Sequence, residues 1–132
     1  MNLRAFLALL AGAIIIAFAV SFMLPLHAFA GECSQMRASW YGAESGSRTA
    51  NGEPFNGTSI TAASRTLPFG TRLRVTYQGK SVVVRINDRG PFHRDKHGRY
   101  DRDLDLSHAV AKALGTIHAG VATVLVCRLA SR

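Results

Sequence analysis

Asp88 stands where a single carboxyl group could do chemistry. It follows the run 81–87, in which three valines and an isoleucine predict a buried strand, and it precedes the turn-forming residues Gly90 and Pro91. An acid at such a strand end can face a cleft and act there as an ionised group. It can equally act as an Asx-turn residue that accepts backbone hydrogen bonds. The residues alone are compatible with both interpretations.

Glu53 is the second acid with a suggestive setting. It lies between Gly52 and Pro54, in a loop predicted for residues 43–58 that is rich in glycine, serine and asparagine. A general acid must be protonated near neutral pH, which requires a raised carboxyl pKa. An ionised Asp88 nearby would raise the pKa of Glu53 by like-charge repulsion. The alternative is a solvated loop residue, because glutamate is mostly exposed in proteins.

Two further side chains are candidates for contact with a ligand. Arg89 can bind a ligand carboxylate or pair with Asp88, and the two interpretations have similar weight. Trp40 and Tyr41 point to opposite faces of their predicted strand, so at most one of them lines the site. Tyr41 is the one predicted to line the site and stack on a sugar.

Six short strands and one short helix are predicted to position these residues. Leu73 and Val75 alternate with polar residues, which is typical of a half-buried strand. Ser107 and Gly115 are favourable residues for the start and the end of a helix at 108–114. The strands are expected at residues 37–41, 59–63, 71–77, 81–87, 103–106 and 121–129. Short strands with long connections favour a mainly β fold, a small closed barrel rather than a sandwich.

The first thirty residues have the pattern of a secretory signal peptide. Arg4 gives a positive start, residues 5–24 are apolar, and Ala28 and Ala30 form a small-residue cleavage site before Gly31. The apolar run is also about long enough to cross a bilayer, so an uncleaved anchor is the rival interpretation. Cleavage would leave residues 31–132 as one small domain without a stable membrane anchor.

The composition is strongly basic, with 16 lysines and arginines against 8 acidic residues, a net charge of +8. Such a charge suits an acidic partner, and export argues against nucleic acid as that partner. A basic surface that only keeps an exported protein soluble is the alternative. His93 and His97 have a spacing that would suit a metal on a helix, but their segment does not read as a helix. No metal site and no cofactor are predicted.

Cys33 and Cys127 lie near the two ends of the predicted mature domain. Outside the cytoplasm, a lone pair of cysteines usually forms one disulfide, so a Cys33–Cys127 bridge is expected. A lipid on Cys33 is not expected, because Glu32 stands where a lipoprotein signal needs a small residue.

Six motifs in a fixed order resemble one known family. They are ASWYG (38–42), RTANGEPF (48–55), TAASRTLPFGT (61–71), VVVRINDRGPF (82–92), DLDLS (103–107) and AKALG (111–115). Together they resemble the rare lipoprotein A (RlpA-like) family of septal-ring lytic transglycosylases, over residues 37 to about 128. The resemblance implies a six-stranded double-psi β-barrel with one short helix.

The resemblance also implies an enzyme, a lyase that acts on peptidoglycan. It would cleave the glycan strand between N-acetylmuramic acid and N-acetylglucosamine without water, leaving a 1,6-anhydro-muramoyl end. The family's catalytic acid, the glutamate of its ANGE motif, falls on Glu53, and the aspartate of its NDRGP motif falls on Asp88. Residues expected to contact the substrate are Tyr41, Asn51, Ser64 and Arg89. Ser64 departs from the family pattern, in which a histidine occupies this position.

Two other function classes compete with the enzyme. One is a non-catalytic expansin-like module that binds wall glycans, which the Ser64 departure favours. The other is a basic secreted effector or inhibitor whose fold is held together by one disulfide. No motif in the sequence favours this class. In either glycan-binding case, we expect a monomer in the periplasm or the medium, with peptidoglycan glycan strands as its partner.

Overall fold

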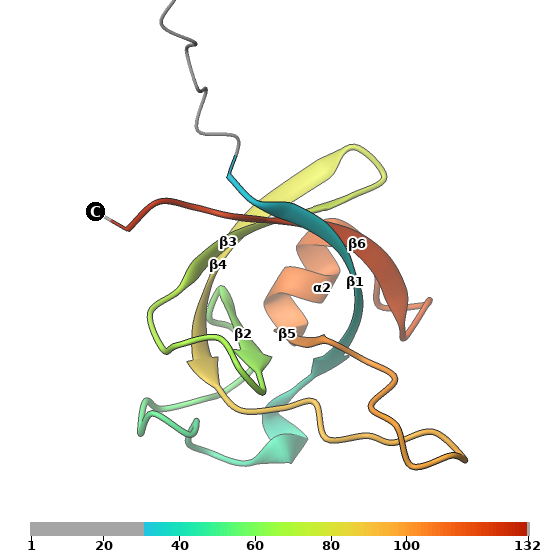
Figure 1. Cartoon of the computed structure of the whole chain (residues 1–132). Helices are drawn as coiled ribbons and strands as arrows, with labels where there is room; N and C mark the ends of the chain where they lie inside the picture. Colours follow the sequence, from blue (N-terminus) through green and yellow to red (C-terminus); the bar gives the residue numbers. More distant parts are fainter. Residues whose placement is uncertain (1–30, 132) are drawn as a thin grey trace, which may run out of the picture. The chain divides into compact units, whose positions relative to one another are not determined.

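The computed structural model describes residues 31–131, in which six strands close into a barrel and one α-helix lies across the ring (Figure 1). The signal-peptide prediction for residues 1–30 lies outside the described residues. The elements in chain order are β1 (Cys33–Tyr41), the 3-10 helix η1 (Ala43–Ser45), β2 (Thr61–Ser64), β3 (Arg72–Tyr77), β4 (Lys80–Asp88), β5 (Leu104–Ser107), α2 (His108–Leu114) and β6 (Ala122–Arg128).

The barrel has the strand order β1-β5-β2-β4-β3-β6, and β6 pairs back with β1. The pairs β1/β5 and β2/β4 are parallel, while the other neighbours are antiparallel. The predicted mainly β barrel of six strands with one short helix is therefore confirmed.

The core follows from the alternation in the strands. Leu73 and Val75 of β3 point inward, where they join the apolar residues of the other strands in one buried cluster. The helix α2 adds Val110 and Leu114 to this cluster and contacts β1, β4 and β5. Its predicted bounds are confirmed: the Ser107 side chain accepts a hydrogen bond from the backbone N–H of Val110, as an N-cap does.

The strand β1 begins earlier than the sequence predicted, at Cys33 instead of residue 37, because its first half pairs with β6. In this register Cys33 lies opposite Cys127, and the two form the expected disulfide. The bridge therefore joins the first strand to the last. Among the described residues, no helix has both the length and the apolar character that crossing a membrane requires.

Candidate functional site

Two aspartates flank one alanine on the outer face of the barrel. Ala63 of β2 is in register with Asp105 of β5 on one side and with Asp88 of β4 on the other. Ser39 of β1 extends the row, because it is the register partner of Asp105. Residues opposite each other on paired strands point to the same face, so this row brings the two carboxyl groups together on one surface.

A β-bulge places Asp88 in that row. Between β2 and β4 the register shifts, so that Ala62 pairs with Ile86 but Ala63 pairs with Asp88. Asn87 is the extra residue, and it is buried, with 1% of its surface exposed. Bulges reorient the side chains that follow them. The bulge therefore turns Asp88 to the face that carries Asp105.

Asp88 is hydrogen-bonded through both carboxylate oxygens. Its Oδ1 accepts from the backbone N–H of Ala50 and of Arg89, each at 2.8 Å, and its Oδ2 accepts from the Tyr41 hydroxyl at 3.2 Å. The turn-capping interpretation of Asp88 is therefore correct, and it also fixes the carboxylate in place. Residues 46–60 form the loop that joins η1 to β2, and the contact with Ala50 holds this 46–60 loop against the end of β4.

Asp105 is a carboxyl group that sequence reasoning missed. Its Oδ1 accepts a hydrogen bond from the Ser39 hydroxyl at 2.9 Å. Burial raises the pKa of Asp105 and repulsion from Asp88 adds to the rise, against the opposing effects of the Ser39 hydrogen bond and of Arg102. The sequence did contain a signal for Asp105. In DLDLS this acid lies between two leucines of a strand, and because those leucines point into the core, Asp105 points to the opposite face.

Tyr41 is buried, with 9% of its surface exposed, and its ring stacks on Phe55 at 4.7 Å between centroids. Burial, and then the charge and hydrogen bond of Asp88, raise the pKa of the Tyr41 phenol above its ordinary value. Trp40 packs against the barrel core, as expected from the opposite faces of the strand. The Tyr41 hydroxyl thus reaches Asp88, whereas its ring is covered by Phe55, which does not support the prediction that this ring stacks on a sugar.

The expectation that the pKa of Glu53 is raised is wrong. Both Glu53 oxygens accept from the Arg85 guanidinium, at 2.6 and 2.8 Å. The side-chain amides of Asn87 and Asn51 donate to the same carboxylate, at 3.0 and 2.9 Å. These hydrogen bonds, that from Arg85 foremost, lower the pKa of Glu53 to about 2. Glu53 is thus ionised, and like-charge coupling to Asp88 is replaced by an ion pair. The like charge that Asp88 does influence is Asp105.

Arg89 and Ser64 are used inside the fold. The Arg89 guanidinium donates to the carbonyl oxygens of Ser64 and Leu67, at 3.1 and 2.8 Å, and lies 3.9 Å over the Phe69 ring. Ser64 is 3% exposed, and its hydroxyl accepts from the backbone N–H groups of Thr66 and Leu67. These contacts do not support the prediction that Arg89 and Ser64 bind the substrate.

The two histidines weighed as metal ligands do not share a site. The Nδ1 atom of His93 lies 2.8 Å from the Asp101 carboxylate, and the backbone of His97 donates to Asp95. Across residues 31–131, no three side chains of histidine, cysteine, aspartate or glutamate gather in a way that could hold a metal ion.

Comparison with known proteins places this barrel in a family. Residues 33–126 match the lytic transglycolase family. The probable endolytic peptidoglycan transglycosylase RlpA of Synechocystis sp. is 56% identical over 90 residues, which cover 66% of this chain and 26% of the relative. The endolytic peptidoglycan transglycosylase RlpA of Pseudomonas aeruginosa is 50% identical over 92 residues, covering 67% and 25%. The chain spans about a quarter of the length of these relatives.

Solved structures are similar in fold at low sequence identity. The Streptomyces papain inhibitor has a TM-score of 0.59 and 22% identity, covering 76% of this chain and 97% of its own. An expansin of Clavibacter michiganensis, solved in complex with cellohexaose, has a TM-score of 0.58 and 22% identity, covering 76% and 52%. These likenesses show the fold alone. The match over residues 33–126 and the RlpA relatives establish that the chain belongs to the RlpA-like lytic transglycolase family, and the solved structures agree with its double-psi β-barrel.

Proposed function

We propose that the protein is an endolytic lytic transglycosylase that cleaves peptidoglycan glycan strands between N-acetylmuramic acid and N-acetylglucosamine. The family match over most of the described chain supports this activity, as do the names of relatives at 50–56% identity. The observation that carries the mechanism is the pair Asp105 and Asp88 on either side of Ala63, in which Asp105 has a raised pKa.

The reaction needs one group that gives and then takes a proton. A carboxylic acid protonates the glycosidic oxygen as the bond to the muramoyl C1 breaks. The C6 hydroxyl of the same sugar then bonds to C1, and the carboxylate accepts its proton. Neither a water molecule nor an enzyme nucleophile is consumed. Such an acid must hold its proton near neutrality. Burial shifts the pKa of Asp105 in the direction that this role requires, whereas the pKa of Glu53 falls to about 2.

The other carboxylates complete the proposed catalytic set as fixed charges. Asp88, held by Ala50, Arg89 and Tyr41, raises the pKa of Asp105 and can stabilise positive charge that develops on the sugar ring. Glu53 remains in the set as an ionised group on the neighbouring loop, with Asn51 beside it as a substrate contact.

The proposal includes the setting of the reaction. We place the protein outside the cytoplasm, in the periplasm or the medium, as a monomer without a stable membrane anchor once the signal peptide is removed. The Cys33–Cys127 disulfide supports an oxidising compartment.

The test is mass spectrometry of purified glycan strands after incubation with the purified protein. A lytic transglycosylase gives products one water lighter than those of hydrolysis, with anhydro-muramoyl ends. Asp105→Asn, which keeps the size and an acceptor for Ser39, should abolish them. Parent protein that retains strands in pull-down but yields no product would favour the expansin-like binding module instead.

A further inference from the structure

One loop connects the two strands that carry the aspartates of the proposed site. Residues 89–103 join β4 to β5, which stand on either side of β2 in the barrel. Asp88 is the last residue of β4, directly before the loop. Asp105 is the second residue of β5, the strand directly after the loop. Any side chain held near the base of this loop therefore lies close to the carboxyl groups that we assign to the reaction.

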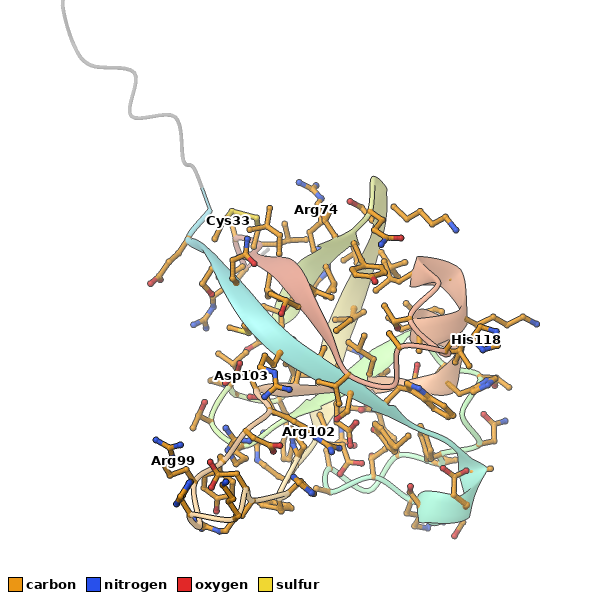
Figure 2. The ribbon with its side chains drawn as sticks, turned by 90° about the vertical axis from the view of Figure 1, so that its right-hand side faces the viewer. Cys33, Arg74, Arg99, Arg102, Asp103 and His118 are labelled. Atoms are coloured by element: carbon orange, nitrogen blue, oxygen red, sulfur yellow. A yellow bond between two sulfur atoms is a disulfide. The ribbon has the colours of Figure 1, made fainter. Side chains whose placement is uncertain are left out.

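Arg65, which directly follows β2, fastens the two legs of the loop together. Its Nη1 atom donates to the carbonyl oxygen of Pro91 on the outgoing leg, at 2.7 Å, and to that of Arg102 on the returning leg, at 2.6 Å. Its guanidinium also lies 4.2 Å over the ring of Tyr100. Figure 2 shows Arg102 close to the barrel and Arg99 at the outer end of the same loop.

The outer part of the loop is braced as well. Arg94 lies 3.9 Å over the Tyr100 ring and donates to the Gly98 carbonyl, while the Asp95 carboxylate accepts from the backbone of His97 and Arg99. The loop projects from the barrel in both views (Figures 1 and 2). The loop is therefore held both at its base and along its outer part, although it is a long connection.

Phe92 is displayed at this fixed base. It follows Pro91, whose carbonyl Arg65 holds, and 63% of its surface is exposed, more than for any other large apolar residue that the structure describes. One edge of its ring lies near Gly90, since a Cβ atom on Gly90 would be 3.7 Å from Cδ2 of Phe92. Single exposed apolar residues are common on protein surfaces. This one lies four residues after Asp88 along the chain, on a leg of the loop that Arg65 holds.

We propose that Phe92 is the aromatic platform on which a hexosamine ring of the glycan strand stacks beside Asp88, with Arg65 as its positioning residue. The proposal rests on the proposed function for its ligand class. The face of an aromatic ring carries negative potential, and the C–H groups on one side of a pyranose ring complement it. Phe92 is the most exposed large aromatic side chain among the described residues, and Phe69, the other exposed phenylalanine, has its ring against the Arg89 guanidinium.

The first test measures binding without turnover, in the Asp105→Asn background. Affinity for purified glycan strands should fall about five- to tenfold on Phe92→Ala and be retained by Phe92→Trp, which keeps a stacking face. Leu125→Ala is the matched control, since Leu125 is 40% exposed on β6, away from the loop. Unchanged affinity for Phe92→Ala, or an equal loss for Leu125→Ala, would overturn the platform.

The second test uses the protein with Asp105 intact. Phe92→Ala should raise KM for strand cleavage by a similar factor with little change in kcat, because the platform binds ground state and transition state alike. If the parent cleaves nothing but Phe92→Ala still weakens binding, the proposed function fails while the platform stands. If the parent cleaves and Phe92→Ala leaves KM unchanged, the platform fails alone.

The positioning role of Arg65 is tested by a double-mutant cycle. Arg65→Met removes the donors but keeps the length of the side chain, and it should weaken strand binding in the same direction as Phe92→Ala. Because Arg65 acts through Phe92, Arg65→Met combined with Phe92→Ala should bind no more weakly than Phe92→Ala alone. Fully additive losses would mean that Arg65 acts on something other than the platform.

Discussion

Asp105 and Glu53 are carboxyl groups whose surroundings move their pKa values in opposite directions. Burial raises the pKa of Asp105, while the Arg85 guanidinium and two amides hold the pKa of Glu53 at about 2. Two acids separated in this way can divide the labour of a glycosidic cleavage, one as the proton donor and the other as a fixed negative charge. The motif alone would assign the donor role to Glu53, and the ion pair to Arg85 is the reason to move it.

Asp105→Asn should abolish cleavage and also stabilise the protein at neutral pH. Folding raises the pKa of Asp105, so its favourable contribution is present below the ordinary aspartate pKa of about 3.9 and is lost as the pH rises through the raised value. Asparagine avoids this loss. The thermal midpoint of the variant should exceed that of the parent at pH 7 and approach it at pH 3. A lower midpoint at pH 7 would show that the Asp105 carboxylate is a structural anion.

Glu53→Gln should have the opposite pH dependence. The pKa of Glu53 falls from 4.5 to about 2 on folding, so its contribution is present above pH 4.5 and is lost as the pH falls toward 2. The variant should melt below the parent at pH 7, and the gap should close at pH 2. Glu32→Gln, at an exposed residue, is the control. Loss of all cleavage in Glu53→Gln while Asp105→Asn remains active would return the acid role to Glu53.

The sequence indicated Asp88 and Glu53 as candidate site residues, but it did not indicate which side chains they contact. Arg85 is two residues before Asn87 on β4, and its pairing with Glu53 depends on how the 46–60 loop folds back onto that strand. Asp105 lay in a predicted strand, yet its neighbour Asp88 comes from a strand two positions away in the barrel. Contacts of this kind follow from strand order, which a residue pattern does not contain.

At the scale of elements, the position of β2 and of the turn after it was predictable. The hydrogen bonds that the Ser64 side chain makes in this turn were not. Its hydroxyl accepts two backbone N–H groups of the turn, and its side chain is enclosed. The bulge at Asn87 was equally hidden, because a strict alternation after the core residue Ile86 would have turned Asp88 inward. The shift in register from Ala62/Ile86 to Ala63/Asp88 is the sign of the bulge in the structure.

Ser64→His should therefore destabilise the protein without increasing anhydro-product formation, although it restores the family's residue. The larger ring has to enter a site where Ser64 is 3% exposed, and the two N–H groups lose their acceptor. Losing a buried hydrogen bond typically costs about 1–3 kcal/mol. Chemical denaturation and product analysis of Ser64→His and Ser64→Ala check this. A histidine variant with parental stability and more product would show that the pocket accepts the family's arrangement.

At the scale of the whole molecule, the closed barrel and its short helix were predictable because strand length, alternation and capping residues agree with one another. The start of β1 was not, because its first residues, 33–36, form a strand only through pairing with β6. That pairing is what brings Cys33 beside Cys127, far along β1 from Ser39 and Tyr41. The covalent link and the proposed chemistry thus lie at different ends of one strand.

Removing the disulfide should therefore lower stability far more than activity. The bridge closes a loop with a sequence separation of 94 residues. Constraining an unfolded chain over such a loop stabilises a fold by about 4–5 kcal/mol in the chain-entropy model. Urea unfolding of Cys33→Ser/Cys127→Ser should show a loss of this order, and the oxidised parent should show no free thiol when denatured. At a temperature where the variant is still folded, its cleavage rate should match that of the parent, because the row from Ser39 to Asp88 does not involve the bridge. A folded variant that binds strands but no longer cleaves them would mean that the bridge fixes the geometry of the site as well as the ends of the barrel.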